Sequence, residues 1–203
     1  MRNSYSIFKF FAIASYILRT KLISPKSRII RFPIDLRGKR MIDFGKKLTT
    51  GKYCRIEAIN TGKTHKKIIF GKNVQINDFV HICALEKVVI CDNVLIASHV
   101  YISDNSHGIY NGKNNDSNPL TPPIERDYFI SPVCIGDNTW IGEGVIIMPG
   151  VNIGKGCIIG AHSIVKTNIQ DYSIAVGSPA KIVKRYSFDD GCWKKTDIFG
   201  NYL

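Results

Sequence analysis

Histidine is the side chain most able to exchange a proton near neutral pH, because the unperturbed pKa of imidazole is about 6.5. The chain contains five histidines. His107 differs from the others in its position, in the segment SDNSHG (residues 103–108), directly after a predicted strand and at the start of a long loop. A histidine placed there is a candidate general base that removes the proton of an attacking hydroxyl group.

Asp104 lies three residues before His107 and is a candidate to orient its ring. The alternative interpretation is that both are ordinary polar residues of a loop. The position of His107 makes it a better candidate for the general base than the other four histidines. Its role therefore depends on the elements that hold the loop.

The chain from residue 133 to residue 166 repeats with a period of six, VCIGDN TWIGEG VIIMPG VNIGKG CIIGAH SIVK. Each hexad has one aliphatic position and a smaller residue two places before it. Side chains two residues apart share a strand face, so both positions are expected to point inward. The aliphatic positions are Ile135, Ile141, Ile147, Ile153, Ile159 and Val165, and the smaller ones are Val133, Thr139, Val145, Val151, Cys157 and Ser163. Glycine follows in four hexads, where we expect corners with unusual backbone angles.

The same period occurs upstream. The corresponding inward positions there are Phe70, Ile76, Ile82, Ile90, Ile96 and Ile102, with a weaker set at Phe44, Thr50 and Ile56. About fifteen hexads in total, three to a triangular coil, give about five coils. A sandwich of antiparallel strands would instead repeat at roughly every 8–12 residues. The sequence therefore predicts an all-β fold, a parallel β-helix.

Interruptions of the period mark segments that leave the coils. From Ile102 to Ile135 the chain advances 33 residues where six would suffice, so about 27 residues leave the coils, which predicts one long protruding loop over residues 103–132. A shorter interruption covers residues 58–67, and two extra residues expand a corner near Glu86. After Val165 we expect a capping strand, a short C-terminal helix from about residue 179 to residue 185, and a loosely docked tail over residues 187–203.

The N-terminal segment, residues 1–28, is expected to form an amphipathic helix. Its apolar stretch from Ile7 to Leu18 is shorter than the roughly 20 residues that span a bilayer. Residues 1–24 combine this apolar stripe with positive charge, which is typical of segments that rest on an acidic membrane surface. Packing on the same domain or on a sister subunit is the alternative.

Composition indicates a folded protein with a basic surface. The chain is 44% apolar and 22% charged, with a formal net charge of +12. Such a charge favours anionic partners, although a solvated basic surface explains it equally well. The six cysteines form no CxxC pair, which favours reduced thiols and a cytoplasmic location.

The hexapeptide pattern resembles the bacterial hexapeptide acyltransferase superfamily over about residues 29–186. The resemblance implies a left-handed coil, against the usual right-handed preference of parallel crossovers, and a homotrimer. The segments IIRFP (29–33), VQINDFVHI (74–82) and AVGSPAKIVK (175–184) are similar to those of O-antigen and capsule O-acetyltransferases. The implied reaction is acetyl transfer from acetyl-CoA to a hydroxyl of a sugar or surface polysaccharide. No metal and no nucleic-acid partner are expected.

The segment SDNSHG resembles the catalytic loop of the galactoside, maltose and polysaccharide O-acetyltransferases, which implies that His107 is the general base of a direct transfer. Asn77 and Glu86 match positions that contact the acceptor sugar, although Asn77 also suits a turn at a corner. Trp140 matches an aromatic residue beside the base and the acyl donor. Packing against another subunit would explain an exposed tryptophan equally well.

Two further segments resemble those that bind CoA. By this resemblance Ala161 meets the pantetheine through its backbone, and Lys166 and Thr167 flank the adenine. Lys181 and Lys184 neutralise phosphates, with lysine where relatives often have arginine, which keeps the charge and loses bidentate geometry.

Other functions remain open at this point. The acceptor could be an antibiotic, or an amino sugar acetylated on nitrogen. A zinc enzyme similar to the carbonic anhydrases of this fold would need His81, His99 and His107, of which the first two are otherwise expected to be surface residues. A catalytically silent scaffold is the last alternative.

Overall fold

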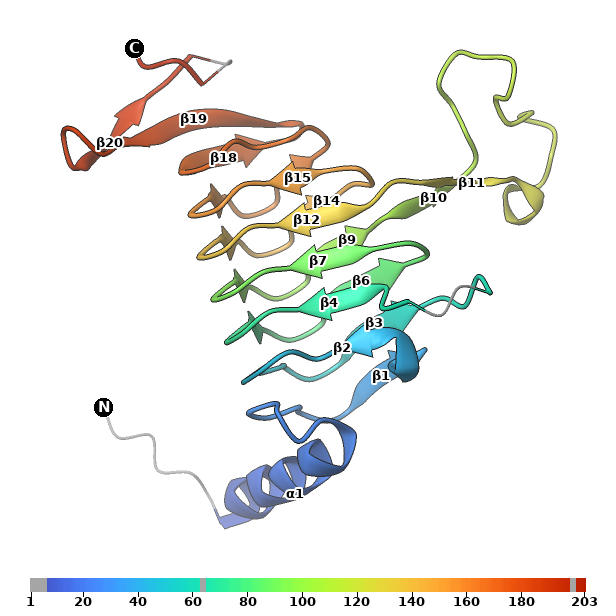
Figure 1. Ribbon diagram of the computed structural model, residues 1–203, viewed down its shortest axis with the longest axis vertical. Coiled ribbons are helices and arrows are strands. Elements are labelled where there is room, and N and C mark those ends of the chain that lie inside the picture. Colours follow the sequence, from blue (N-terminus) through green and yellow to red (C-terminus); the bar gives the residue numbers. More distant parts are fainter. Residues whose placement is uncertain (1–6, 63–64, 198–199) are drawn as a thin grey trace.

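The computed structural model describes residues 7–62, 65–197 and 200–203. The helix α1 (Ile7–Ile23) lies at one end of a stack of short strands, and the C-terminal strands lie at the other end (Figure 1). The strands wind into a three-sided prism whose sides are parallel sheets, here called faces 1, 2 and 3. A short 3-10 helix, η1 (Lys39–Met41), follows the first strand.

The chain visits the three faces in rotation. Face 1 contains β1 (Ile34–Arg37), β3 (Cys54–Ala58), β6 (His81–Ala84), β9 (Tyr101–Ser103), β14 (Ile146–Ile147) and β17 (Ile164–Val165). Face 2 contains β2 (Ile42–Asp43), β4 (Ile68–Phe70), β7 (Val88–Ile90), β12 (Val133–Ile135) and β15 (Asn152–Ile153). Face 3 contains β5 (Gln75–Ile76), β8 (Leu95–Ile96), β13 (Trp140–Ile141), β16 (Ile158–Ile159) and β18 (Ser173–Gly177).

The predicted inward positions form the core. The six aliphatic positions between residues 135 and 165 are fully buried, and the six smaller positions are buried beside them. The strand register aligns equivalent positions of successive coils, so that Ile82 lies beside Ile102 and Ile102 beside Ile147 on face 1. Burying each such side chain contributes about 1.5–3 kcal/mol. The repeat thus fixes both the interior and the alignment of successive coils.

The glycines after the aliphatic positions have a different role from the one predicted. Their φ angles are ordinary, so unusual backbone angles do not explain them. A Cβ at Gly136 would lie 2.6 Å from the backbone nitrogen of Lys155, and one at Gly142 would lie 2.7 Å from that of Ala161. Close approach between successive coils therefore requires glycine at these corners.

The long loop leaves the stack after β9. Its base is an antiparallel pair, β10 (Asn105–His107) with β11 (Tyr128–Ile130), and the residues between them project sideways from the prism (Figure 1). The projection includes the short 3-10 helix η2 (Pro123–Glu125). The chain then re-enters face 2 at β12.

The predicted C-terminal helix is wrong. Residues 180–187 form strand β19 (Ala180–Ser187), which pairs antiparallel with β18 and with β20 (Cys192–Lys195). The physical reason is that β18 ends the stack and leaves a free sheet edge, which β19 covers. The expected tail is likewise paired into this sheet as far as Lys195, and β19 runs across the boundary expected at residue 187.

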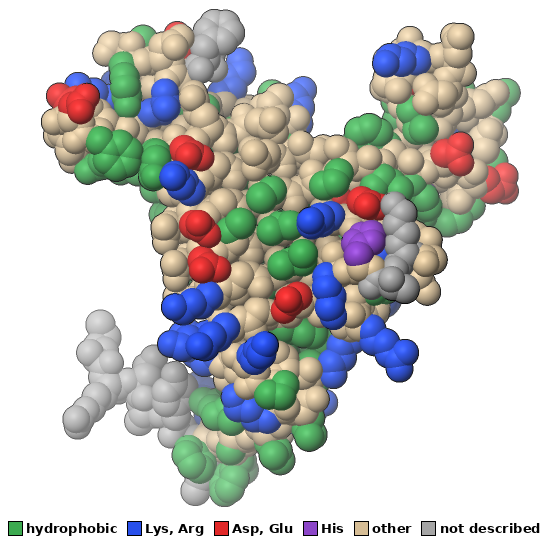
Figure 2. Space-filling model, viewed as in Figure 1, with side chains coloured by type: hydrophobic (Ala, Val, Ile, Leu, Met, Phe, Trp, Pro, Cys, Tyr) green, Lys and Arg blue, Asp and Glu red, His purple; other side chains and the backbone are tan. Residues whose placement is uncertain are grey.

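Helix α1 is docked at its C-terminal end. The buried hydroxyl of Thr20 accepts a hydrogen bond from the backbone N–H of Ile30 at 2.7 Å, and the guanidinium of Arg19 lies 3.7 Å from the ring centre of Phe32. Hydrophobic side chains gather at this end of the molecule, with Lys and Arg beside them (Figure 2). Within the described part of the chain, no helix has the length and apolar character needed to cross a membrane.

Candidate active site

Asp104 fixes the base of the long loop. Its buried carboxylate accepts hydrogen bonds at 2.6–2.8 Å from the three backbone N–H groups of residues 85–87, and one at 2.9 Å from Nδ2 of Asn105. These bonds account for both carboxylate oxygens, and none involves His107. Asp104 therefore does not orient the imidazole ring directly, as the sequence suggested it could, but holds the strand on which the ring is carried.

The expanded corner at residues 85–87 is also held from its other side. Lys67 is fully buried, and its Nζ donates hydrogen bonds to the carbonyl of Leu85 and to the hydroxyl of Thr61. A buried ammonium or carboxylate is tolerated only when its hydrogen bonds are made. Residues 85–87 of this corner thus supply one carbonyl to the buried lysine and three N–H groups to the buried aspartate.

His107 lies on β10 at the root of the projecting loop. Its ring centre is 4.7 Å from that of Tyr128 on the paired strand β11, and the two planes are inclined by 45°. Its backbone carbonyl accepts a hydrogen bond from the hydroxyl of Tyr110 at 3.0 Å, and that hydroxyl in turn accepts one from Arg126 at 2.7 Å. The loop therefore fixes the backbone of His107 while leaving its imidazole exposed.

A cleft of about 460 Å³ lies between the outer side of face 1 and the base of the loop, and His107 lines it. Arg55, His81 and Tyr101 line it from three strands in direct register on face 1. The loop contributes Tyr128 as well as His107. The cleft thus combines aromatic rings with polar side chains beside the candidate base, an arrangement suited to a sugar.

Glu57 also lines this cleft, and sequence reasoning missed it. Its carboxylate accepts hydrogen bonds from Nε2 of His81 and from the guanidinium of Arg55, each at 2.8 Å. Burial raises the pKa of Glu57, but the hydrogen bonds and charges of His81 and Arg55 outweigh that effect and hold the pKa below its usual value. His81, expected to be a surface residue, is therefore part of an ordered polar group in the cleft.

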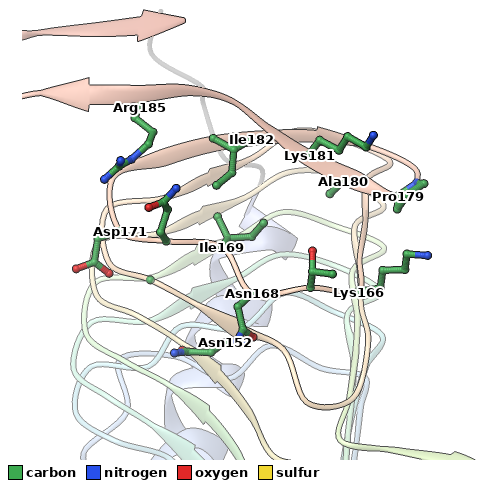
Figure 3. A pocket seen from close by; sticks show the side chains of 13 residues that line it. Asn152, Lys166, Asn168, Ile169, Asp171, Pro179, Ala180, Lys181, Ile182 and Arg185 are labelled. Atoms are coloured by element: carbon green, nitrogen blue, oxygen red, sulfur yellow. Dashed lines mark hydrogen bonds between the residues drawn. The ribbon is translucent and has the colours of Figure 1, made fainter. Parts of the chain in front are cut away.

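A second groove, of about 780 Å³, lies between the last coil and β19 (Figure 3). It brings together Lys166, Thr167 and Lys181, three of the residues expected to bind CoA. Arg185 lines its other end, and within the described residues its buried Nε has no hydrogen-bond partner. Lys184 is not among the lining residues.

The remaining predicted residues lie elsewhere on the prism. Asn77 lines a hollow of about 560 Å³ that His107 does not line. Trp140 is half exposed on the outer side of face 3, and Ala161 is exposed at the corner after β16. Glu86 lies at the expanded corner of residues 85–87, where its carbonyl is 3.0 Å from Nε2 of His65. A single chain therefore does not bring these residues to His107.

The three histidines of the zinc alternative do not form one site. His99 stacks on Phe79 at 4.9 Å and is absent from the lining of the cleft that His81 and His107 share. Across residues 7–62, 65–197 and 200–203, His, Cys, Asp and Glu side chains form no group of three or more that could hold a metal ion.

Comparison with known proteins agrees with the repeat. Residues 135–167 match the bacterial transferase hexapeptide (six repeats) family. WbbJ of Escherichia coli (strain K12), whose provisional name is lipopolysaccharide biosynthesis O-acetyl transferase, is 38% identical over 195 residues, which cover 96% of this chain and 97% of WbbJ. The chain belongs to the bacterial hexapeptide transferases.

Other hexapeptide transferases show more distant similarity. The galactoside O-acetyltransferase of Escherichia coli (strain K12) is 33% identical over 123 residues, covering 61% of this chain and 56% of that protein. The crystal structure of a point mutant of AntD, an N-acyltransferase from Bacillus cereus, superposes with a TM-score of 0.68 at 22% identity, over 85% of this chain and 91% of that one. The fold of this hexapeptide transferase is accordingly the left-handed β-helix.

Replacing Asp104 by Asn tests whether its hydrogen bonds to residues 85–87 anchor the base of the loop. The amide nitrogen of Asn cannot accept a hydrogen bond, so at least one of the N–H groups of residues 85–87 loses its acceptor, and the free energy of unfolding in urea is expected to fall by about 1–3 kcal/mol. Asp127→Asn, at an exposed aspartate of the same loop, is the matched control and should change stability by less than about 0.5 kcal/mol. Unchanged stability in Asp104→Asn would contradict the anchoring role.

Proposed function

We propose that this protein is an acetyl-CoA-dependent O-acetyltransferase that acetylates a sugar hydroxyl of a cell-surface polysaccharide, O-antigen or capsule, or of its precursor. The observation that carries the proposal is the exposed imidazole of His107 at the edge of a polar and aromatic cleft. The provisional name of WbbJ and the name of the galactoside O-acetyltransferase support both the reaction and the acceptor class.

His107 acts as the general base. The neutral imidazole takes the proton of the sugar hydroxyl while the oxygen attacks the thioester carbonyl of acetyl-CoA. A tetrahedral oxyanion forms, the carbon–sulfur bond breaks, and the imidazolium returns the proton to the departing thiolate. The products are the acetyl ester and free CoA.

Transfer is direct, without an acetylated cysteine. Cys83 is the cysteine that lines the cleft, and burial raises the pKa of its thiol. A thiol whose pKa is raised is a poor nucleophile near neutral pH, because the thiolate is the reactive form. This property supports attack by the sugar oxygen itself.

CoA lies along the groove beside β19. Lys166 and Thr167 flank its adenine end, and Lys181 neutralises a phosphate there, since these three side chains line one groove. The same groove offers Arg185, whose buried Nε has no hydrogen-bond partner among the described residues. Lys184 adds positive charge from outside the lining.

The active unit is a homotrimer. The outer side of face 3 exposes Leu95 and Trp140, an apolar surface of the kind that a sister subunit covers. Trp140, Ala161 and Asn77 lie away from His107 within one chain, and a second copy packed beside the loop would bring them to the cleft. CoA then runs between subunits.

His107→Ala tests the assigned base. Acceptor-dependent release of CoA thiol from acetyl-CoA, measured over a panel of sugars and polysaccharide fragments, is expected to fall by about 10²- to 10⁴-fold. His99→Ala, on another edge of the prism, should retain wild-type rates. Thiol release that persists in His107→Ala would overturn the role of His107 as the base. If the wild type acetylates none of the sugars and polysaccharide fragments but does acetylate antibiotics or amino sugars, those compounds are the acceptors instead.

In this account the protein is cytoplasmic and α1 rests on the inner face of the cell membrane, near a lipid-linked acceptor. Phe8, Phe10, Phe11, Leu18 and Leu22 on α1 are each between 64% and 82% exposed. Lys9, Arg19 and Lys21 add positive charge on the same helix. Exposed apolar side chains next to cations are what an anionic lipid surface binds.

Membrane binding can be tested by flotation with vesicles of phosphatidylcholine alone or mixed with phosphatidylglycerol. The wild type should float with the anionic vesicles and be released by salt. Phe11→Ser with Leu18→Ser should abolish flotation, because it removes apolar contact area. Leu120→Ser with Ile124→Ser, two exposed apolar residues of the long loop, is the matched control. Flotation unaffected by the helix substitutions would contradict this part of the proposal.

A further inference from the structure

The cleft holds two imidazoles, and the proposed reaction uses one. His81 lies on β6, and its side chain is 32% exposed and lines the same cleft as His107. Its neighbours on face 1, Arg55 and Tyr101, lie in direct register on either side. A second histidine so placed has access to whatever acceptor reaches His107.

The hydrogen bond to Glu57 decides which nitrogen of His81 carries the proton. A carboxylate only accepts hydrogen bonds, and the Oε1 atom of Glu57 lies 2.8 Å from Nε2 of His81. Nε2 therefore holds the hydrogen in the neutral ring, and Nδ1 is left as an acceptor. Among the described residues Nδ1 has no hydrogen-bond partner, so the cleft contains an unused acceptor.

The ring of His81 is also held firmly. The side chain of Glu57 is only 9% exposed, and its other oxygen accepts from Arg55 at 2.8 Å and lies 3.5 Å from the guanidinium of Arg37. The ring of Tyr101 meets the imidazole edge-on at 5.2 Å. A carboxylate that orients a histidine in this way fixes its tautomer and its direction before a ligand arrives.

We propose that His81, oriented by Glu57, binds the acceptor by accepting a hydrogen bond at Nδ1 from a second hydroxyl, one that is not acetylated. The acceptor is accordingly a sugar with a free hydroxyl near the reacting one, and alcohols with an isolated hydroxyl are poor substrates. This inference rests on the proposed function of the cleft. His81 is an acceptor-binding residue and His107 remains the base.

Two substitutions separate the nitrogens of His81. Gln places its amide nitrogen near Nε2, so His81→Gln keeps the donor to Glu57 and loses the acceptor at Nδ1. Asn places its amide oxygen near Nδ1, so His81→Asn keeps an acceptor in the cleft. Loss of one hydrogen bond should raise the KM for the sugar by about tenfold in His81→Gln, and less in His81→Asn. The KM for acetyl-CoA should not change in either.

The matched control is His99→Gln, whose ring stacks on Phe79 at another edge of the prism. A series of monodeoxy analogues of the best acceptor identifies the second hydroxyl. Removing it should raise the KM of the wild type about tenfold and leave the KM of His81→Gln unchanged, since that partner is already lost. A sugar KM in His81→Gln equal to that of His99→Gln would overturn the proposal, as would a further loss in His81→Gln with every deoxy analogue.

The tautomer can be measured without activity. Nitrogen-15 NMR of histidine-labelled protein should show His81 protonated at Nε2 and not at Nδ1, and Glu57→Gln should weaken that preference. A ring protonated at Nδ1 would overturn the proposal even if the enzyme acetylates sugars. A wild type that acetylates no sugar would instead refute the proposed function, and the NMR result would still decide the tautomer.

Discussion

The stacking of buried aliphatic side chains at six-residue spacing is the constraint on which the rest of the structure depends. Because Ile82, Ile102 and Ile147 lie in register, a strand of only a few residues still has a single register with its neighbours. The same register aligns the outward side chains of adjacent strands. The floor of the cleft, with Arg55, His81 and Tyr101 aligned on face 1, is a consequence of the packing inside.

The repeat also explains why a departure from it must be anchored. A loop that leaves a stack of such short strands would loosen the neighbouring coils unless its base were fixed. Asp104 and Lys67 fix it by buried hydrogen bonds to one expanded corner. A site that moves a proton gains from this arrangement, because His107 lies three residues beyond the anchor and its strand is paired to β11. Rigid support and an exposed imidazole are thereby combined in one segment.

Features that depend on neighbouring residues could be predicted from the sequence. The inward positions follow from a period of six, and the position of His107 follows from where the period breaks. The helix predicted for the C-terminal segment is wrong because Pro179 followed by Ala180 and Lys181 is typical of a helix start, whereas the free edge of β18 favours a strand. Local propensity gave no information about that edge.

Side-chain contacts between coils could not be predicted either, because local sequence carries no information about them. Glu57 and His81 are 24 residues apart, and Asp104 bonds to groups 17 to 19 residues before it. Nothing in the local pattern distinguishes Glu57 from other outward polar residues. The glycines at the corners were predicted for their backbone freedom, but the spacing between coils is what requires them.

We propose above that acetyl transfer takes place in the cleft of His107. A crystal structure of the protein with CoA and an acceptor sugar tests it most directly. We expect a sugar hydroxyl within hydrogen-bonding distance of the His107 imidazole, with the CoA thiol beside it and the nucleotide along the groove of Lys166 and Lys181. A sugar bound away from this cleft, with the thiol directed to another histidine or to none, would show that His107 is not the base.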